Sequence, residues 1–411
     1  YRLCGHSKSD KLLYRTREEE EAWKEKDPIL RFIASASLDS QRAETVRKEA
    51  MDEVEEAWNE AYASRDQILT LEEAEAFVTP EAEPLPVKGE GRRHPATYRE
   101  AVREALAEIF RSSSHYTLMG EDIGVYGGCF GVTGNLIEEF PDRIWETPVS
   151  EEAFIGLASG AAMLGEHPIA EIMYADFMTL ASDGIINHAA KAYFMSAGQL
   201  QSPMVVRAAM GGGTGHGAQH TQCLENMFLN KPGLKVVAPS GPYSAKALLK
   251  SAAKDNCPVL FFEHKGLYNM EGECGGEEDF LPLGKAIVSG EGKDLLVIGY
   301  SRPFAEAKKA LSDLSVTYLD IASLKPLDEE AIREYGSRFK NILIVQDTPL
   351  QGSVAETVIR ILSEVPGARS LRVVGALDMP LAFSKTLERT ILPSGERIRR
   401  EALEMLGENH G

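Results

Sequence analysis

Cysteine is scarce in this sequence, and its arrangement does not suggest a disulfide framework. The five cysteines among 411 residues are scattered, odd in number, and include no CxxC pair. Because small secreted domains carry paired cysteines at regular spacings, we expect a reducing compartment, either the cytoplasm or an organelle matrix. The five are Cys4, Cys129, Cys223, Cys257 and Cys274.

Long apolar runs and an excess of positive charge are missing as well. The longest weakly polar stretch, residues 154–165, is far shorter than the roughly 20 residues that a membrane-spanning helix needs. Lys and Arg number 44 against 63 Asp and Glu, and the net charge of −19 repels nucleic-acid phosphates. The sequence has no P-loop, no GxSxG motif and no ligand spacing typical of zinc sites. We expect neither a membrane span nor a nucleic-acid partner.

The length and composition predict several domains. The chain opens on YRLCGHSKSD, without an initiator Met or a signal segment, so we expect further residues upstream. Helix formers dominate residues 43–66, which predicts a solvated helix. Four prolines and two glycines in residues 79–96 predict a linker. The N-terminal helical segment would then be residues 1–78.

The rest of the chain alternates between strand-like and helix-like patterns. Thr97 is a candidate N-cap for an amphipathic helix, and apolar runs such as residues 116–120, 203–210 and 258–264 predict buried strands. This βαβ rhythm is typical of a doubly wound α/β domain with a mostly parallel sheet, which we assign to residues 97–275. Residues 281–411 repeat the pattern and predict a second, smaller α/β domain.

Two local motifs have more than one interpretation. The glycine cluster at residues 211–218 contains a formal GxGxxA match, as in dinucleotide sites, but no acidic residue follows at the distance that a ribose contact needs. A loop that brings His220 to the surface is the alternative, and a lone histidine is more often structural than catalytic. Glu151 follows Pro148 and Ser150 at a predicted helix start, where an acid also serves as an ordinary partner of the helix dipole.

A combination of longer motifs resembles one enzyme family. MGEDIGVYGGCFGVTGNLIEEFPDRIWETPVSEEAFIG, then AEIMYADFMTLASDGIINHAAKAYFMSAGQ, GAQHTQCLENMF and FEHKGLY resemble the β subunits of the first components of pyruvate, branched-chain 2-oxo acid and acetoin dehydrogenases. The match runs in order from about Thr97 to Leu406. Residues 1–32 are similar to the C-terminal third of the matching α subunit. The resemblance implies a thiamine-diphosphate-binding pyrimidine domain, a transketolase C-terminal-like domain, and an α-type tail fused to a nearly whole β-type subunit.

The resemblance also implies roles for individual residues. Glu151 matches the glutamate that hydrogen-bonds the cofactor's aminopyrimidine and exchanges the proton that activates it. Phe177 matches an aromatic that packs on the pyrimidine, Glu121 an acid near the cofactor, and Arg2 a contact to the diphosphate.

The remaining implied roles concern acyl transfer and metal ions. His220 matches a histidine near the lipoyl entry, and His6 matches an α-loop histidine that protonates lipoyl sulfur or orients substrate. A potassium ion is implied chiefly at backbone oxygens of four residues, namely Met204, Ala252, Asp255 and Cys257. Magnesium belongs to a Gly-Asp-Gly…Asn element of the α half, which this sequence lacks, and Asp347 stands where the family usually has Glu.

The resemblance implies oxidative decarboxylation of a small 2-oxo acid, with pyruvate favoured, and acyl transfer to the lipoyl domain of a dihydrolipoyl acyltransferase. The implied partners are an α-type half that completes the diphosphate and magnesium site and a second copy in a two-fold assembly. Acetoin or branched-chain substrates, a transketolase-like sugar transferase, and a non-catalytic assembly subunit remain alternatives.

Overall fold

The computed structural model describes residues 1–5, 7, 13–36, 38–67, 69–82, 84–85, 92–367 and 369–407. The chain divides into two compact units, Tyr1–Glu72 and Glu73–Gly411. The predicted segment 1–78 therefore extends six residues beyond the first unit. Phe77 belongs to the second unit, where its ring lies 6.4 Å from that of Tyr193.

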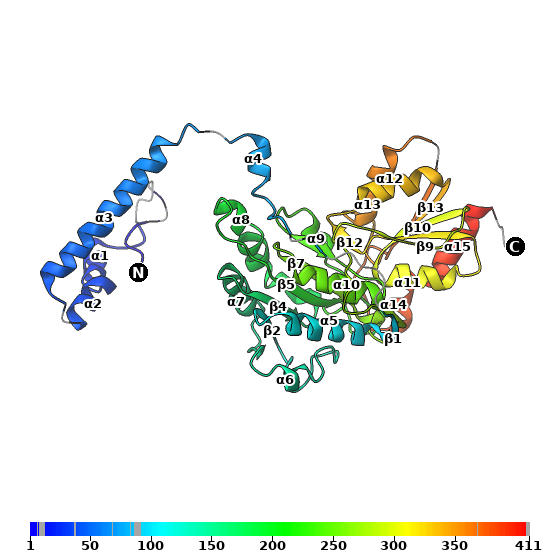
Figure 1. Cartoon of the computed structure of the whole chain (residues 1–411), viewed down its shortest axis with the longest axis horizontal. Coiled ribbons are helices and arrows are strands. Elements are labelled where there is room, and N and C mark those ends of the chain that lie inside the picture. Colours follow the sequence, from blue (N-terminus) through cyan, green and yellow to red (C-terminus); the bar gives the residue numbers. More distant parts are fainter. Residues whose placement is uncertain are drawn as a thin grey trace. The chain divides into compact units, whose positions relative to one another are not determined.

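The first unit is helical (Figure 1). It contains α1 (Arg17–Lys24), α2 (Pro28–Ser35) and α3 (Ser40–Ala63), and α4 (Leu71–Glu75) spans the division between the units. α3 corresponds to the helix predicted at residues 43–66 and begins earlier, because the Asp39 carboxylate accepts the backbone N–H groups of Gln41 and Arg42. None of α1, α2 and α3 buries a side chain.

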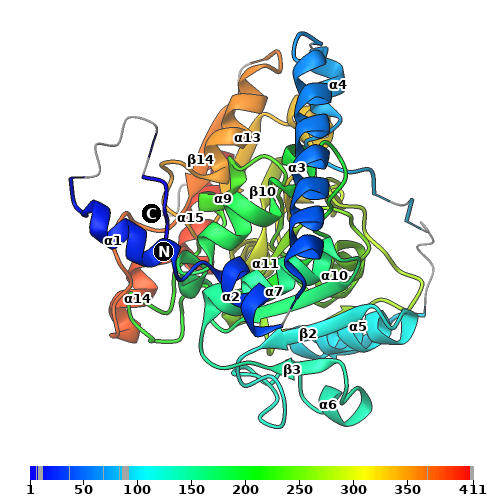
Figure 2. The same ribbon diagram turned by 90° about the vertical axis from the view of Figure 1, so that its left-hand side faces the viewer.

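The second unit contains, among the described residues, a seven-stranded sheet in the order β12-β6-β7-β5-β4-β2-β3. Figure 2 shows β2 and β3 side by side at one edge. Every pairing is parallel except that of β12 with β6. The strands are β2 (Tyr116–Gly120), β3 (Ile144–Glu146), β4 (His167–Ile172), β5 (Val205–Met210), β6 (Lys235–Val237), β7 (Val259–His264) and β12 (Ser323–Lys325).

Helices cover both faces of this sheet because successive strand residues point to opposite sides. On one face, α5 (Tyr98–Ser112) and α10 (Pro242–Ala253) pack on residues such as Ile169. On the other, α7 (Glu151–Met163) packs on residues such as Ala170. Thr97 caps α5 through a capping box with Glu100, as predicted. The shorter elements are α6 (Leu136–Glu139), η1 (Ala175–Thr179), η2 (Gly184–Ala189), α8 (Ala192–Met195), α9 (Asn226–Leu229) and η3 (Lys265–Leu267).

A second, five-stranded sheet forms the predicted C-terminal domain, in the order β14-β13-β10-β11-β9. Its apolar core is continuous with one face of the first sheet through residues such as Leu296 and Ile344. The strands are β9 (Ile287–Ser289), β10 (Leu295–Gly299), β11 (Val316–Asp320), β13 (Asn341–Val345) and β14 (Ser370–Val374). The helices are α11 (Ser301–Ala310), α12 (Glu329–Arg338), α13 (Val354–Ser363), α14 (Lys385–Ile391) and α15 (Gly395–Leu406).

Three local features differ from the sequence patterns. Residues 183–195, whose composition is typical of an ordinary helix, form a π-helical turn, η2, followed by the short α8. The last residues of the predicted linker belong to β1 (His94–Thr97), which pairs with β8 (Glu271–Cys274) in a separate two-stranded antiparallel sheet. β12 comes from the C-terminal part of the sequence but pairs with β6 in the first sheet. Among the described residues, no helix is both long and apolar enough to cross a membrane.

Candidate active site

The candidate site lies at the carboxyl edge of the seven-stranded sheet. β2, β4, β5 and β7 run parallel, so the segments that follow them emerge at the same edge. These segments carry Glu121, Phe177, His220 and Lys265, and β3 at the same edge leads to Glu151. Ligands of open α/β sheets bind at such edges.

Two acidic side chains lie together at the start of α7. Glu151 is the first residue of that helix and is 8% exposed, while Glu121 follows β2 and is 3% exposed. Glu121 Oε1 accepts the backbone N–H of Ser150, the N-cap of α7, at 3.0 Å. Burial, and secondarily the neighbouring charge of Glu151, raises the pKa of Glu121. The structure thus brings these two predicted residues together.

Two other predicted residues, Phe177 and His220, are also in contact. Their rings meet edge to face with centroids 5.4 Å apart. Tyr174 completes the group, at 4.9 Å from His220 and 6.0 Å from Phe177. His216 lies 6.1 Å from Tyr174, and burial lowers its pKa. The rings of this aromatic group meet edge to face, which offers apolar ring faces and edges to a ligand.

Lys265 brings a buried ammonium to the same group. Its side chain is 6% exposed, its Nζ lies 4.7 Å from the centre of the Tyr174 ring, and it donates a hydrogen bond to the carbonyl oxygen of His220. Among the described residues, no carboxylate lies within 4.0 Å of it. Burial therefore lowers the pKa of Lys265 to about 8.

Two buried carboxylates fix the loop that carries the histidines. Asp176 Oδ1 accepts the backbone and side-chain N–H groups of Gln222 at 3.3 and 2.8 Å, while its buried Oδ2 has no hydrogen-bond partner among the described residues. Glu388 of α14 is fully buried and accepts the backbone N–H groups of Gly213 and Gly215 at 2.8 and 3.0 Å. The loop is thus a positioned structure, and the C-terminal domain supplies part of its support.

A glycine is required where this loop leaves β5. Gly211 has a φ of +89°, and a Cβ there would lie 2.0 Å from Nε2 of His264. Glycine therefore serves close packing at this position. The alternative interpretation of the cluster as a dinucleotide loop finds no helix start here, since the loop continues without a helix until α9.

A buried ion network supports the strands beneath the site. Arg207 of β5 is 2% exposed and binds Glu263 in bidentate fashion at 2.7 and 2.9 Å, and Glu171 at 2.6 Å. Tyr268 donates a hydrogen bond to Glu263 Oε2 at 3.0 Å. Because one cation faces two carboxylates, burial raises the pKa of Glu171 and the two acids raise that of Arg207 against its own burial.

A second set of buried charges joins the two domains beside the loop. His264 Nε2 lies 3.0 Å from Asp347 Oδ2, and Arg302 lies 2.9 Å from Asp347 Oδ1. The Arg302 guanidinium and the neighbouring His264 hold the pKa of Asp347 well below its usual range, although burial acts in the opposite direction. Asp347 is the residue that we expect to replace a glutamate, on the resemblance described above. It also lines a cavity of about 570 Å³ between residues 218–224 and 376–381.

The other predicted residues lie elsewhere or outside the described chain. Arg2 belongs to the first unit, where its carbonyl oxygen accepts a hydrogen bond from Arg15 at 2.6 Å, and His6 lies outside the described residues. Residues 204, 252, 255 and 257, predicted to hold potassium, lie toward the amino ends of β5 and β7, opposite the candidate site. There Asp255 Oδ2 already pairs with Lys235 at 2.6 Å.

Sequence reasoning missed several residues of this site. Lys265 directly follows the strand predicted at residues 258–264, and Tyr174 follows β4, so the carboxyl-edge rule could have identified both. His216 lies within the glycine cluster at residues 211–218, where the glycine pattern drew attention to the backbone and away from the histidine. Glu388 carried no local signal, since more than 170 residues separate it from the glycines that it binds.

Comparison with known families agrees with this architecture. Residues 94–271 match the family described as transketolase, pyrimidine binding domain, residues 284–398 match transketolase, C-terminal domain, and residues 1–69 match dehydrogenase E1 component. Of the solved structures, a split-gene transketolase described as an inactive beta4 tetramer shares the fold, with a TM-score of 0.62 at 20% identity over 76% of this chain and 99% of its own.

Curated relatives are more similar in sequence. The 2-oxoisovalerate dehydrogenase subunit beta of Bacillus subtilis is 39% identical, over 75% of this chain and 98% of the relative. The acetoin:2,6-dichlorophenolindophenol oxidoreductase subunit beta of the same organism is 36% identical, over 75% and 96%. The pyruvate dehydrogenase E1 component subunit beta of Gracilaria tenuistipitata var. liui is 40% identical, over 71% and 93%. The chain therefore belongs to the thiamine-diphosphate-dependent E1 family of 2-oxo acid dehydrogenases, with an α-type segment preceding a β-type subunit.

Proposed function

We propose that this chain takes part in the oxidative decarboxylation of pyruvate and in acyl transfer to the lipoyl group of a dihydrolipoyl acyltransferase. The observation that supports the proposal is that the buried Glu151–Glu121 pair and the aromatic group around Phe177 and His220 lie at the same edge of one sheet. Relatives named for pyruvate include proteins 40% and 38% identical to this chain.

The residues present fit the pyrimidine half of thiamine diphosphate. A buried carboxyl at a helix start can hydrogen-bond a ring nitrogen, a phenylalanine can stack on the ring, and Asp176 Oδ2 is a buried acceptor in need of a donor. The diphosphate half has no counterpart, because the Gly-Asp-Gly…Asn element is absent from the sequence. We therefore assign magnesium and its ligands to an α-type half.

When bound, thiamine diphosphate supplies the nucleophilic carbon and the electron sink for decarboxylation. In this proposal Glu151 holds and exchanges the proton at the pyrimidine nitrogen, and Glu121 keeps α7 in place through Ser150. His220 and the α-loop residue His6 act on the lipoyl sulfur, while Arg2 contacts the diphosphate. Lys265, Asp176 and Glu388 hydrogen-bond to the loop at residues 211–222 and would thereby keep His220 oriented.

One potassium ion and a second copy of the chain complete the proposal. Potassium would bind near Asp255 through backbone oxygens, with a structural role, because that region lies at the opposite sheet edge from Glu151. We further propose a two-fold assembly in which β-type subunits pair. The absence of buried side chains in α1, α2 and α3 is consistent with helices that pack on a partner.

The decisive experiment measures lipoyl-dependent acyl transfer by this chain combined with its α-type half. Pyruvate, 3-methyl-2-oxobutanoate and acetoin are compared as substrates at equal concentration. Acetoin is the second candidate, because two relatives carry that name at 36% and 35% identity. Highest kcat/KM with pyruvate supports the proposal. Turnover of acetoin but not of pyruvate would contradict the proposal, and so would turnover of a sugar phosphate. Absence of turnover with every substrate, while the acyltransferase still binds, would also contradict it.

A further inference from the structure

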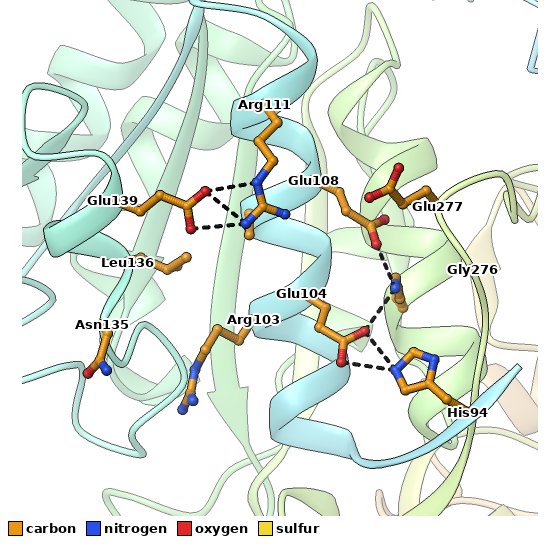
Figure 3. Close-up of a pocket in the computed structure, with 12 residues that line it drawn as sticks. His94, Arg103, Glu104, Glu108, Arg111, Asn135, Leu136, Glu139, Gly276 and Glu277 are labelled. Atoms are coloured by element: carbon orange, nitrogen blue, oxygen red, sulfur yellow. Dashed lines mark hydrogen bonds and ion pairs between the residues drawn. The ribbon is translucent and has the colours of Figure 1, made fainter. Parts of the chain in front are cut away.

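The two-stranded sheet of β1 and β8 places a histidine and a cysteine on the same side. His94 and Cys274 are directly opposite each other in this antiparallel pair. Residues in such a position project to the same face of the sheet. α5 lies against that face and contributes Glu104, and Figure 3 shows the His94 ring and the Glu104 carboxylate directed at one another. Three side chains of metal-binding chemistry thus converge from three elements.

We propose that His94, Glu104 and Cys274 bind one Zn²⁺ ion. Their ligand atoms all lie within 4.8 Å of one another. His94 Nε2 is 3.0 Å from Glu104 Oε1 and 3.1 Å from Oε2, and Cys274 Sγ is 3.7 Å from Oε2. Tetrahedral zinc with ordinary bond lengths requires N···O and S···O edges of about 3.3 and 3.5 Å. The distances to Glu104 differ from these by a few tenths of an ångström, and the ligand atoms of His94 and Cys274 lie within 4.8 Å of each other. Side-chain shifts then admit the ion.

The surroundings provide access and an open coordination position. A cavity of about 580 Å³ reaches solvent and is lined by His94 and Glu104, while Cys274 is fully buried behind them. An ion can enter from the cavity, and a water molecule from the same side completes four ligands. This is the arrangement of a metal site with three protein ligands.

The local charges are compatible with a divalent cation. A carboxylate and a thiolate neutralise Zn²⁺, and the nearby Lys246 is compensated by Glu108 at 2.7 Å. Lys246 also holds Glu104 Oε2 at 2.9 Å, which orients the carboxylate. The Cys274 thiol releases its proton to solvent when zinc binds.

A second cluster of the same composition lacks this capacity. Cys223, His264 and Asp347 also lie within 4.8 Å of one another. However, His264 Nδ1 accepts the backbone N–H of Gly266 at 2.9 Å, so in the neutral ring Nε2 carries the proton. Binding a metal there would require an imidazolate. This cluster is therefore a matched control within the same chain.

The proposed ion links the β1–β8 sheet to α5 and lies away from the candidate active site. α5 covers one face of the seven-stranded sheet and α7, which begins with Glu151, packs on the other. The proposal is therefore independent of the proposed function, and its test needs no turnover.

The test is titration of the full chain with Co²⁺ alone, followed by competition with Zn²⁺, in a Cys4→Ser background that removes the exposed thiol. Thiolate-bound tetrahedral cobalt gives a near-ultraviolet charge-transfer band and strong visible bands. We expect one equivalent to bind in the parent and in Cys223→Ser, and zinc to displace it. Cys274→Ser is expected to lose the charge-transfer band, and His94→Gln to weaken zinc binding by more than about ten-fold.

Thermal unfolding supplies a second readout. Zinc should raise the Tm of the parent and of Cys223→Ser, and leave that of His94→Gln unchanged. Equal zinc affinity in the parent and in both site variants would overturn the proposal, as would absence of cobalt binding by the folded parent. A charge-transfer band that disappears in Cys223→Ser instead would assign the ion to the other cluster and overturn it equally.

Discussion

The carboxylate of Glu388 accepts the backbone N–H of Gly213 at 2.8 Å across the junction of the two domains. Its second oxygen binds the N–H of Gly215, and the side chain is fully buried. Each glycine that the carboxylate binds stands shortly before His216 and His220. The conformation of the histidine loop thus depends on a residue of α14.

Replacement of Glu388 by Gln should loosen this loop. The amide keeps the shape but offers one acceptor where two N–H groups converge, and it leaves one buried donor unsatisfied at a cost on the order of 1–3 kcal/mol. We expect faster hydrogen exchange in residues 211–222 and a larger loss of lipoyl-dependent turnover than of decarboxylation with an artificial acceptor. Glu356→Gln is the matched control, because Glu356 accepts an exposed glycine N–H at Gly352. Equal effects of the two variants, or an unchanged loop, would contradict the prediction.

Glu151→Gln should abolish activation of the cofactor in the assembled enzyme. An amide preserves the packing at the start of α7 but does not exchange the pyrimidine proton. The measurement is the rate of hydrogen–deuterium exchange at C2 of thiamine diphosphate, with circular dichroism as a check of folding. Glu152→Gln, one residue further along the same helix and exposed, should retain the parent rate. Exchange at the parent rate in Glu151→Gln would remove Glu151 from this role.

Lys265 should make stability rise with pH in alkaline solution. Burial lowers the pKa of Lys265 to about 8, whereas lysine in an unfolded chain titrates near 10.4. Between these values the unfolded protein binds the proton and the folded protein does not, so the free energy of unfolding increases with pH. Below pH 8 both states are protonated and the cost of burying the ammonium is fully present.

Denaturant unfolding of the parent and Lys265→Met at pH 7.5 and pH 10 measures this effect. The parent should gain on the order of 2–3 kcal/mol relative to the variant between the two values. Lys285→Met, at an exposed lysine, should follow the parent. A difference between parent and Lys265→Met that does not change with pH would show that the ammonium is not destabilised by burial.

Thiamine diphosphate should bind weakly to this chain alone and normally once an α-type half is added. Pyrimidine recognition gives a hydrogen bond and ring stacking, while the diphosphate requires magnesium with oxygen ligands in near-octahedral geometry. Isothermal titration with magnesium and thiamine diphosphate, with and without the α-type half, measures the difference. Micromolar affinity of the chain alone would place the diphosphate site within residues 1–411 and contradict this prediction.

The sequence predicted the order of helices and strands well, because hydrophobic periodicity and helix capping depend on nearby residues. The cap at Thr97, the buried strand 116–120 and the parallel βαβ rhythm all depend on residues within a few positions of one another. The family resemblance identified Glu151, Glu121, Phe177 and His220, and the structure pairs them two by two at one edge.

Long-range contacts were beyond local reasoning. Neither the contact of Glu388 with the glycine loop nor the meeting of His94 with Cys274 leaves a mark in sequence spacing, since 180 residues separate the latter pair along the register. The π-helical η2 also escaped prediction, because its composition is that of an ordinary helix and tertiary packing decides its hydrogen-bond pattern. Gly184 lies there against Ile155, and a Cβ added at residue 184 would come within 3.1 Å of the Ile155 side chain.

The strand β12 has a consequence for any attempt to separate the two domains. It comes from the C-terminal part of the chain, yet it pairs antiparallel with β6 at the margin of the other domain's sheet. A fragment that ends before residue 323 would leave β6 with a free row of backbone donors and acceptors, which invites pairing between molecules. We expect such a fragment to aggregate through β6. The strand that the C-terminal domain contributes therefore protects the first domain from self-association.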